Sequence, residues 1–190
     1  MFADLGVPPV DAETERTFLG PPFRDSLGPY VGSDRFEEAI AIYRRYYGAG
    51  GGSLVTTVYA GIPDALARLH AGGIRLGLAT SKAKAFAPAI LDHLGLSPYF
   101  EVVSGDDLAG RRGTKAAIVA EAVRRLGAPE PASVLMVGDR FHDVHGAAAN
   151  GIATLGAGWG YGAPGELAGA GALSVLNHPR EVVPYFLTGA

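Results

Sequence analysis

The stretch Ser133-Val-Leu-Met-Val-Gly-Asp-Arg-Phe-His-Asp143 decides the fold class. Residues 133–137 form an almost entirely apolar run without polar alternation, which is typical of a parallel strand covered by helices on both faces. A Gly-Asp pair follows directly, and Asp143 comes four residues after Asp139. The strand therefore ends with two carboxylates at the edge where open parallel sheets bind their ligands.

Short apolar segments alternate with helical patterns on both sides of this stretch. We predict strands at 74–79, 100–103, 133–137 and 152–155. We predict helices at 62–70, 83–94, 115–126 and 143–150, with a last helix that begins near Pro179. This alternation predicts an α/β fold with a Rossmann-like, doubly wound parallel sheet. The glycine-rich segment 156–171 is interpreted as an active-site loop or a surface loop.

The first sixty residues follow a different pattern. Phe36, Ile40, Tyr43 and Tyr47 are spaced along one helical face, and Ser33 or Asp34 is expected to cap that helix. An earlier helix is predicted around 11–19, before the Pro21-Pro22 turn. We therefore divide the chain into a small helical unit, 1–60, and an α/β unit, 61–190.

Composition excludes several classes of function. The 190 residues include 16 Lys and Arg against 19 Asp and Glu, a net charge of −3, so no basic field favours a nucleic acid polymer. Cysteine is absent, which excludes disulfides, thiolate metal sites and cysteine catalysis. No apolar run has the roughly 20 residues of a membrane helix, and the N-terminus lacks a signal-peptide pattern. We expect a cytoplasmic protein with no membrane partner.

The two aspartates are the strongest chemical signal. Two hard oxygen ligands at the end of a strand suit Mg²⁺, which is held by few carboxylates together with waters and substrate phosphate. The purely structural interpretation makes Asp139 a turn residue and Asp143 a helix N-cap. Both interpretations stay open on the spacing alone.

Three further residues favour phosphate as the ligand. Thr80 and Ser81 follow the strand predicted at 74–79, and they would offer hydroxyls and backbone N–H groups at the start of the next helix. Lys115 lies in the first turn of a predicted helix, where the helix dipole disfavours a cation. The plain alternatives are helix caps for Thr80 and Ser81 and a solvated side chain for Lys115.

Taken in this order, Thr80-Ser81, Lys115 and Gly-Asp139-x-x-x-Asp143 resemble the haloacid dehalogenase (HAD) superfamily of phosphatases. The resemblance covers most of the chain, and it is closest to the phosphoglycolate phosphatase-like branch and its 5′-nucleotidase-like members. The motifs that carry it are Tyr59-Ala-Gly-Ile-Pro-Asp, Ala79-Thr-Ser-Lys, Val137-Gly-Asp-Arg-Phe-His-Asp-Val, Gly146-Ala and Trp159-Gly-Tyr-Gly.

The resemblance implies a role for each residue. Thr80 and Ser81 would bind the transferring phosphoryl group, and Lys115 would neutralise its charge. Asp139 would bind Mg²⁺, and Asp143 would support the metal or Lys115. Residues 1–60 would form the helical cap, residues 58–62 the hinge, and residues 61–190 the HAD core.

One part of that family's pattern is absent from this sequence. The chemistry begins with an Asp nucleophile, and an Asp acid/base follows two residues later, at the end of the first strand; no Asp-x-Asp occurs here. Asp4 has no partner, Asp11 lies in a helical stretch, and Asp106 and Asp107 are adjacent. We therefore expect an N-terminally truncated form of the family, without the central strand of its sheet.

Two functions follow from these observations. The first is a Mg²⁺-dependent phosphomonoesterase acting on a small phosphate ester, a nucleoside monophosphate or a phosphoglycolate-like molecule, with the activity belonging to a longer chain. Arg44, Arg45 and Tyr47 are the candidates for the substrate rim. The alternative is a catalytically inactive HAD-like protein that binds a phosphate ligand or a partner. The oligomeric state stays open.

Overall fold

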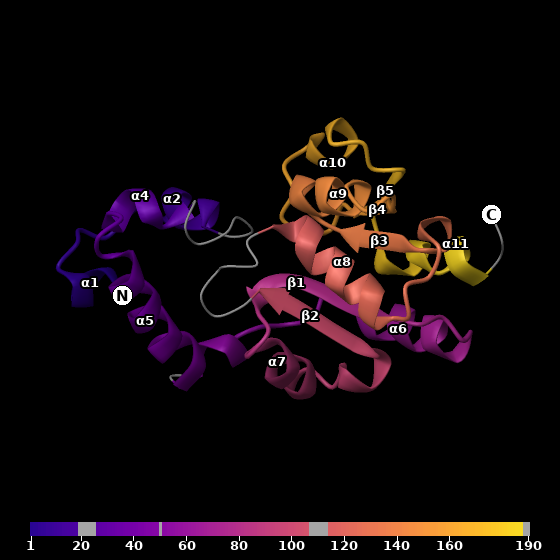
Figure 1. Cartoon of the computed structure of the whole chain (residues 1–190), viewed down its shortest axis with the longest axis horizontal. Helices are drawn as coiled ribbons and strands as arrows, with labels where there is room; N and C mark the ends of the chain where they lie inside the picture. The colour runs from indigo at the N-terminus through magenta and orange to yellow at the C-terminus, as the bar shows by residue number, and fades with distance from the viewer. Residues whose placement is uncertain (19–25, 50, 107–113, 188–190) are drawn as a thin grey trace.

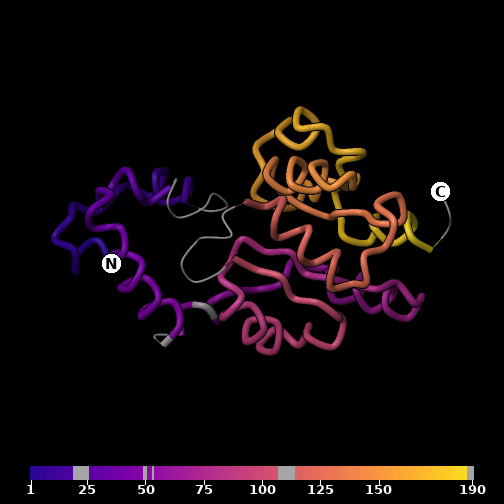
Figure 2. Tube along the Cα trace, viewed as in Figure 1, coloured from indigo at the N-terminus to yellow at the C-terminus, as the bar shows by residue number. Residues whose placement is uncertain are grey.

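The computed structural model describes residues 1–18, 26–49, 51–106 and 114–187. A helical region, residues 1–54, lies beside an α/β region, residues 61–187 (Figure 1). Figure 2 shows that the chain begins in the helical region at one end of the molecule. Its last described helix, α11 (Pro184–Leu187), lies at the opposite end. Among the helices of the described ranges, none has the length and apolar character that crossing a membrane requires.

The helical region has its own small core. Its elements are α1 (Phe2–Leu5), α2 (Ala12–Thr17), α4 (Gly28–Val31), α5 (Phe36–Arg44), the π-helical turn η1 (Arg45–Ala49) and the 3₁₀ turn η2 (Gly52–Leu54). Leu27, Phe36 and Ile40 are buried in one apolar cluster, as the spacing of Phe36 and Ile40 predicts. The expected cap of α5 was wrong: Arg35 is its N-cap residue and makes no capping bond with its side chain.

Within the described residues, five parallel strands form the centre of the α/β region. They are β1 (Gly77–Ala83), β2 (Val102–Asp106), β3 (Leu135–Gly138), β4 (Ala153–Ala157) and β5 (Ser174–Leu176). The helices between and after them are α6 (Ile62–Ala71), α7 (Ala87–His93), α8 (Lys115–Arg125), α9 (Phe141–Ala148) and α10 (Glu166–Gly169). The described part of the region also contains the 3₁₀ turns η3 (Ser97–Tyr99), η4 (Pro131–Ser133) and η5 (Pro179–Val182). The predicted parallel α/β fold class is confirmed.

The strands belong to two separate sheets. β1 pairs with β2, and β3, β4 and β5 pair in that order, but no ladder joins the two sheets within the described residues. Both sheets nevertheless contribute to one apolar cluster, because Ala79 of β1 and Met136 of β3 pack against the buried side chains of Val119, Ala147 and Ile152. Val137 of β3 remains 38% exposed, although a central strand of a parallel sheet is normally buried. β1 and β3 therefore each present an unpaired edge.

Several predicted boundaries were wrong by a few residues. The first strand runs over 77–83 and not 74–79, so Thr80 and Ser81 lie inside β1 and not after it. The next helix begins at Ala87 and not at 83, because the chain is irregular at 80–83, where the register with β2 shifts. The second strand was placed two to three residues too early, and β5 was not predicted.

Candidate active site

Lys115 and Asp143 form the centre of the site. The Lys115 ammonium lies 2.7 Å from Oδ1 of Asp143, and both side chains are largely buried. The same ammonium donates a hydrogen bond to the carbonyl oxygen of Ala79 in β1, at 2.7 Å. Lys115 thus connects the two sheets that share no ladder. A lysine with these two partners is not the solvated side chain of the plain alternative.

Asp143 is held by the local structure that begins α9. Its Oδ2 accepts hydrogen bonds from the backbone N–H groups of Asp139 and Arg140, both at 3.1 Å. Asp143 is therefore the third residue of the helix and forms half of a capping box, so the N-cap interpretation was wrong. A Cβ at Gly138 would lie 2.3 Å from the Asp143 Cβ, which explains the glycine at the end of β3.

A loop after β4 closes around Asp139. The Asp139 Oδ2 accepts a hydrogen bond from the Tyr161 backbone N–H at 2.8 Å. A Cβ at Gly160 would lie 2.2 Å from the Asp139 Cβ, so only glycine allows this approach. The Trp159-Gly-Tyr-Gly segment therefore belongs to the site, which fits the active-site alternative for the glycine-rich segment.

Thr80 and Ser81 belong to β1 in the other sheet, directly after Ala79. The Thr80 Oγ1 accepts a hydrogen bond from the Lys82 backbone N–H at 3.1 Å, and Ser81 is exposed. Because β1 continues to Ala83 and α7 begins only at Ala87, the phosphate cradle expected at a helix N-terminus is not formed there. Thr80 lies next to Ala79, whose carbonyl binds Lys115.

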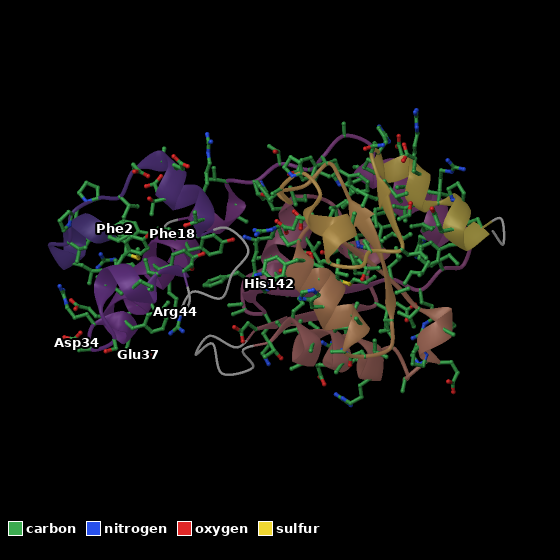
Figure 3. The ribbon with its side chains drawn as sticks, turned by 90° about the horizontal axis from the view of Figure 1, so that it is seen from above. Phe2, Phe18, Asp34, Glu37, Arg44 and His142 are labelled. Carbon is green, nitrogen blue, oxygen red and sulfur yellow. The ribbon has the colours of Figure 1, made fainter. Side chains whose placement is uncertain are left out.

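The three rim candidates occupy different surroundings in the helical region. The Arg45 guanidinium lies 3.6 Å from a carboxylate oxygen of Asp4 within that region. Tyr47 is closer to the site, because its hydroxyl accepts a hydrogen bond from the Lys82 ammonium at 2.8 Å. Arg44 ends α5, in the helical region (Figure 3), and no bond of its side chain connects it to the site among the residues described.

A second ion pair, which the sequence did not predict, lies beside the site. The Arg140 Nε lies 2.8 Å from Oε1 of Glu166, which also accepts the Phe141 backbone N–H at 2.9 Å. The partners are 26 residues apart in the chain, so no spacing rule signals them. Although burial alone would raise it, these hydrogen bonds lower the pKa of Glu166.

Two further ionisable groups lie at the edge of the site. Burial raises the pKa of the Tyr59 hydroxyl, and the neighbouring Tyr161 hydroxyl and Asp139 carboxylate raise it further. Burial lowers the pKa of the His142 imidazole, and Arg140 acts in the same direction. His142 lies on the side of the α/β region that faces the helical region (Figure 3). Tyr59, in the expected hinge, therefore lies within electrostatic range of Asp139.

Of the two aspartates expected near Mg²⁺, only Asp139 has an oxygen available to bind it. The described residues contain no group of three or more His, Asp or Glu side chains that could hold a metal. Both oxygens of Asp143 already have partners, whereas Oδ1 of Asp139 accepts no hydrogen bond from the residues described. Asp139 is thus the one carboxylate here with a free oxygen for a hydrated cation.

The fold and this geometry define a class of protein: a parallel α/β protein with a lysine–aspartate pair and a second carboxylate at the carboxyl ends of its strands. The model of the haloacid dehalogenase-like hydrolase family matches residues 1–157. The chain therefore belongs to the haloacid dehalogenase-like hydrolase family. The resemblance stated from the sequence is confirmed.

Relatives and solved structures agree with this assignment. The chain is 42% identical over 158 residues to the tyrosine-protein kinase PtkA of Mycobacterium tuberculosis, covering 83% of this chain and 54%, about half, of that relative. It is 34% identical over 168 residues to a 5′-nucleotidase of Pseudomonas aeruginosa, covering 87% of this chain and 75% of that one. A solved structure titled a "predicted phosphatase" from Clostridium acetobutylicum superposes with a TM-score of 0.89 at 32% identity, over 98% of this chain and 87% of the other.

Proposed function

We propose that this protein is a phosphomonoesterase that removes the phosphoryl group from a small phosphate ester, either a nucleoside monophosphate or a phosphoglycolate-like molecule. The observation that carries the proposal is the position of the Lys115 ammonium. An ammonium has three N–H donors, and two of them are used by Ala79 and Asp143. The third is available for an oxygen of the transferring phosphoryl group.

Thr80 complements Lys115 from the strand edge. The Thr80 oxygen accepts the Lys82 N–H, which leaves its hydroxyl hydrogen free to donate to a phosphoryl oxygen. Ser81 offers a second hydroxyl next to it. Donors that are already in place stabilise charge that develops on the phosphoryl oxygens without reorganisation during the reaction.

Asp139 and Asp143 have separate roles in this proposal. Asp143 positions Lys115 through the 2.7 Å ion pair. Asp139 would hold Mg²⁺ through its free oxygen, and the bound ion would supply positive charge to the phosphate. Asp139 follows β3 directly and Asp143 lies in the first turn of α9, and the Asp139 backbone N–H donates a hydrogen bond to Asp143 Oδ2.

The nucleophile requires an Asp-x-Asp pair after a strand, and this sequence contains none. We propose that it is carried by an additional parallel strand that pairs with the open edges of β1 and β3. The unpaired edges and the 38% exposure of Val137 support this position. Backbone groups at an open strand edge are ready to pair with another strand. A carboxylate at its end would lie near Lys115 and Asp139, which belong to the two neighbouring sheets.

The helical region is the part of this proposal that determines access to the site. Residues 1–60 would act as a cap that closes over the substrate, with Arg44, Arg45 and Tyr47 on its rim, while residues 61–190 form the core. A small phosphorylated substrate is the expected partner, without a nucleic acid or a membrane, in the cytoplasm. The relatives named as a tyrosine-protein kinase and a 5′-nucleotidase, and the solved structure titled a predicted phosphatase, support a phosphorylated substrate.

The test compares three chains for Mg²⁺-dependent phosphate release from a panel of small phosphate esters. One is the 190-residue chain, the second has an apolar strand ending in Asp-x-Asp fused before Met1, and the third has Asn-x-Asn in the same fusion. We expect activity in the Asp-x-Asp fusion alone. Activity in the 190-residue chain would contradict the position given to the nucleophile.

A second candidate function is binding without turnover, and the absence of Asp-x-Asp from the sequence favours it. In that case none of the three chains releases phosphate, but Mg²⁺ and a phosphate ester together raise the melting temperature of the 190-residue chain. Lys115→Ala should abolish that increase, because it removes the third ammonium donor.

A further inference from the structure

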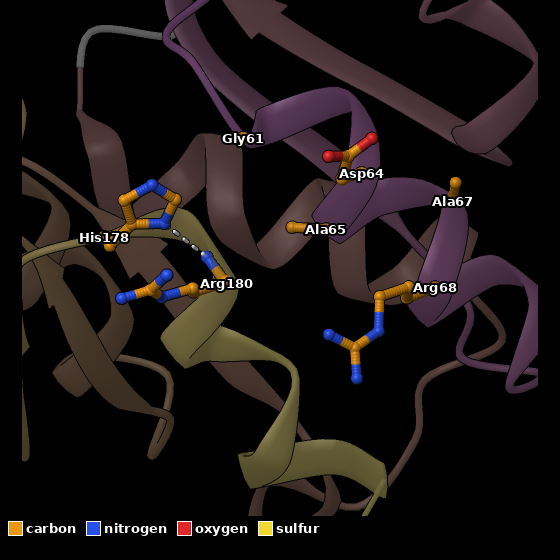
Figure 4. A pocket seen from close by; sticks show the side chains of 7 residues that line it. All are labelled: Gly61, Asp64, Ala65, Ala67, Arg68, His178 and Arg180. Atoms are coloured by element: carbon orange, nitrogen blue, oxygen red, sulfur yellow. Dashed lines mark hydrogen bonds between the residues drawn. The ribbon is translucent and has the colours of Figure 1, made fainter.

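A cavity of about 530 Å³ opens between α6 and η5 (Figure 4). The residues of α6 in its lining include Asp64, Ala65, Ala67 and Arg68. On the other side lie Arg180 of η5 and His178, the N-cap residue of η5. None of these residues belongs to the candidate active site described above. The volume lies in the range of pockets that hold small organic molecules and exceeds what a single ion needs.

Arg68 and Arg180 differ from the other arginines of this region. Four described arginines of the α/β region bind a carboxylate or a backbone carbonyl: Arg75, Arg124, Arg125 and Arg140. By contrast, within residues 61–106 and 114–187 the guanidinium groups of Arg68 and Arg180 make neither an ion pair nor a hydrogen bond. Both line the same cavity, so its wall carries two guanidinium groups that form no ion pair within these ranges, together with the carboxylate of Asp64.

His178 adds an oriented donor to the same wall. Its Nδ1 accepts the backbone N–H of Arg180 at 3.2 Å, which leaves Nε2 as the protonated donor of the neutral ring. The ring also lies against the backbone of Gly61, because a Cβ there would be 2.7 Å from the His178 Cε1. The imidazole is therefore held between η5 and the beginning of α6 (Figure 4).

We propose that this cavity binds the phosphate group of a small hydroxylated metabolite. Guanidinium groups match the oxygens of a phosphate in pairs, and the His178 Nε2–H supplies a further donor. The small side chains of Ala65 and Ala67 leave room for the organic part of the ligand. The Asp64 carboxylate can accept hydrogen bonds from the hydroxyl groups of the ligand. The site is separate from the phosphomonoesterase proposal and does not depend on it.

The test is a titration of the ¹⁵N-labelled 190-residue chain, followed by NMR, with ribose 5-phosphate, inorganic phosphate and citrate as separate probes. We expect saturable shifts at Gly61, Arg68 and His178, with ribose 5-phosphate binding at least tenfold more tightly than the other two. The double variant R68Q/R180Q should weaken this binding at least tenfold. The control R16Q, at an exposed arginine of α2, should leave it unchanged.

Two outcomes of the titration would contradict this proposal. Shifts confined to Lys115, Asp139 and Asp143 would assign the probe to the active site alone and overturn this proposal. If inorganic phosphate bound as tightly as ribose 5-phosphate, the organic part of the ligand would make no contribution, and the proposal of a hydroxylated metabolite would be wrong. Circular dichroism checks that R68Q/R180Q is folded, and A67E, which places a carboxylate in the wall, should also abolish the shifts at His178.

Discussion

The two sheets of the α/β region differ in how firmly they hold the residues that they bring to the site. At the end of β3, Asp143 has three hydrogen-bonded partners and Asp139 is enclosed by the loop at 158–162. At the end of β1, Thr80 makes one local hydrogen bond and Ser81 is exposed. The carboxylate side is thus rigid, and the hydroxyl side is open to a further strand or to a ligand.

Lys115 connects these two sides, and its removal should have the largest effect on stability. In Lys115→Met, Asp143 remains 7% exposed and loses its cation, which should cost about 3 kcal/mol of unfolding free energy. Urea denaturation measures this loss. Arg124→Met is the matched control at an exposed pair with Glu121, and it should cost less than about 1 kcal/mol.

An equal loss in the two variants would show that Lys115 does not connect the sheets. The double variant K115M/D143N, compared with K115M and D143N alone, measures the interaction free energy between the two side chains. If the ion pair is the cause, the double variant should lose less stability than the sum of the single variants, because the buried charge is no longer present.

Gly138→Ala tests the rigid side directly. The added Cβ would lie 2.3 Å from the Asp143 Cβ and displace that side chain, at a cost of about 2 kcal/mol. Thermal or urea unfolding measures the change. Gly169→Ala is the control, because a Cβ there meets no atom within 4 Å and the residue ends α10. A neutral Gly138→Ala would mean that the turn after β3 is not rigid.

The rigid side could be predicted from the sequence more fully than the open side. The apolar run before Gly138 and the spacing of Asp139 and Asp143 are local signals, and the structure places Asp139 directly after β3 and Asp143 in the first turn of α9. The role of Asp143 as third residue of a capping box depends on where α9 begins. That position is set by Arg140 with its extended backbone, which composition does not signal.

The open side depends on interactions that are distant in the sequence. The bounds of β1 follow from its ladder with β2, some 25 residues away, in which Gly77 pairs with Val102. β5 has only three residues, too few to show a period. The Arg140–Glu166 pair and the contact between Lys82 and Tyr47 join segments 26 and 35 residues apart. Such contacts are decided by packing and not by local pattern.

Glu166 gives the rigid side a pH dependence of defined sign. Its pKa is lowered in the folded chain, so its contribution to stability is present above the unfolded pKa of about 4.3 and is lost as the pH falls through the lower folded value. Glu166→Gln should therefore reduce stability by about 1 kcal/mol at pH 7 and by less at pH 3.5.

The measurement is urea unfolding at both pH values, with Glu130→Gln as the control at an exposed carboxylate. A Glu166→Gln effect that is the same at both pH values would show that the hydrogen bonds of Arg140 and Phe141 do not favour the charged form. A control effect as large as that of Glu166 would assign the change to net charge alone.

The smallest effect is expected on the open side, at Lys82. Its ammonium donates to the Tyr47 hydroxyl at 2.8 Å and lies 5.2 Å from the Tyr47 ring centroid, so it joins the helical region to β1. Lys82 is exposed, so Lys82→Met should change the unfolding free energy by less than about 0.5 kcal/mol. The effect of Lys82→Met should stay local, because Tyr47 keeps its contact with Phe86, at 5.3 Å between ring centroids.

The two regions should then open more often without unfolding, since low-stability contacts govern local opening. Hydrogen exchange at Tyr46 and Tyr47 should become faster in Lys82→Met, while exchange in β3 and β4 stays as in the unaltered chain. Lys84→Met, at an exposed lysine two residues further on, should leave both unchanged. If Lys82→Met also accelerated exchange in β3, the two sheets would be coupled through β1, and the difference between a rigid side and an open side would not hold.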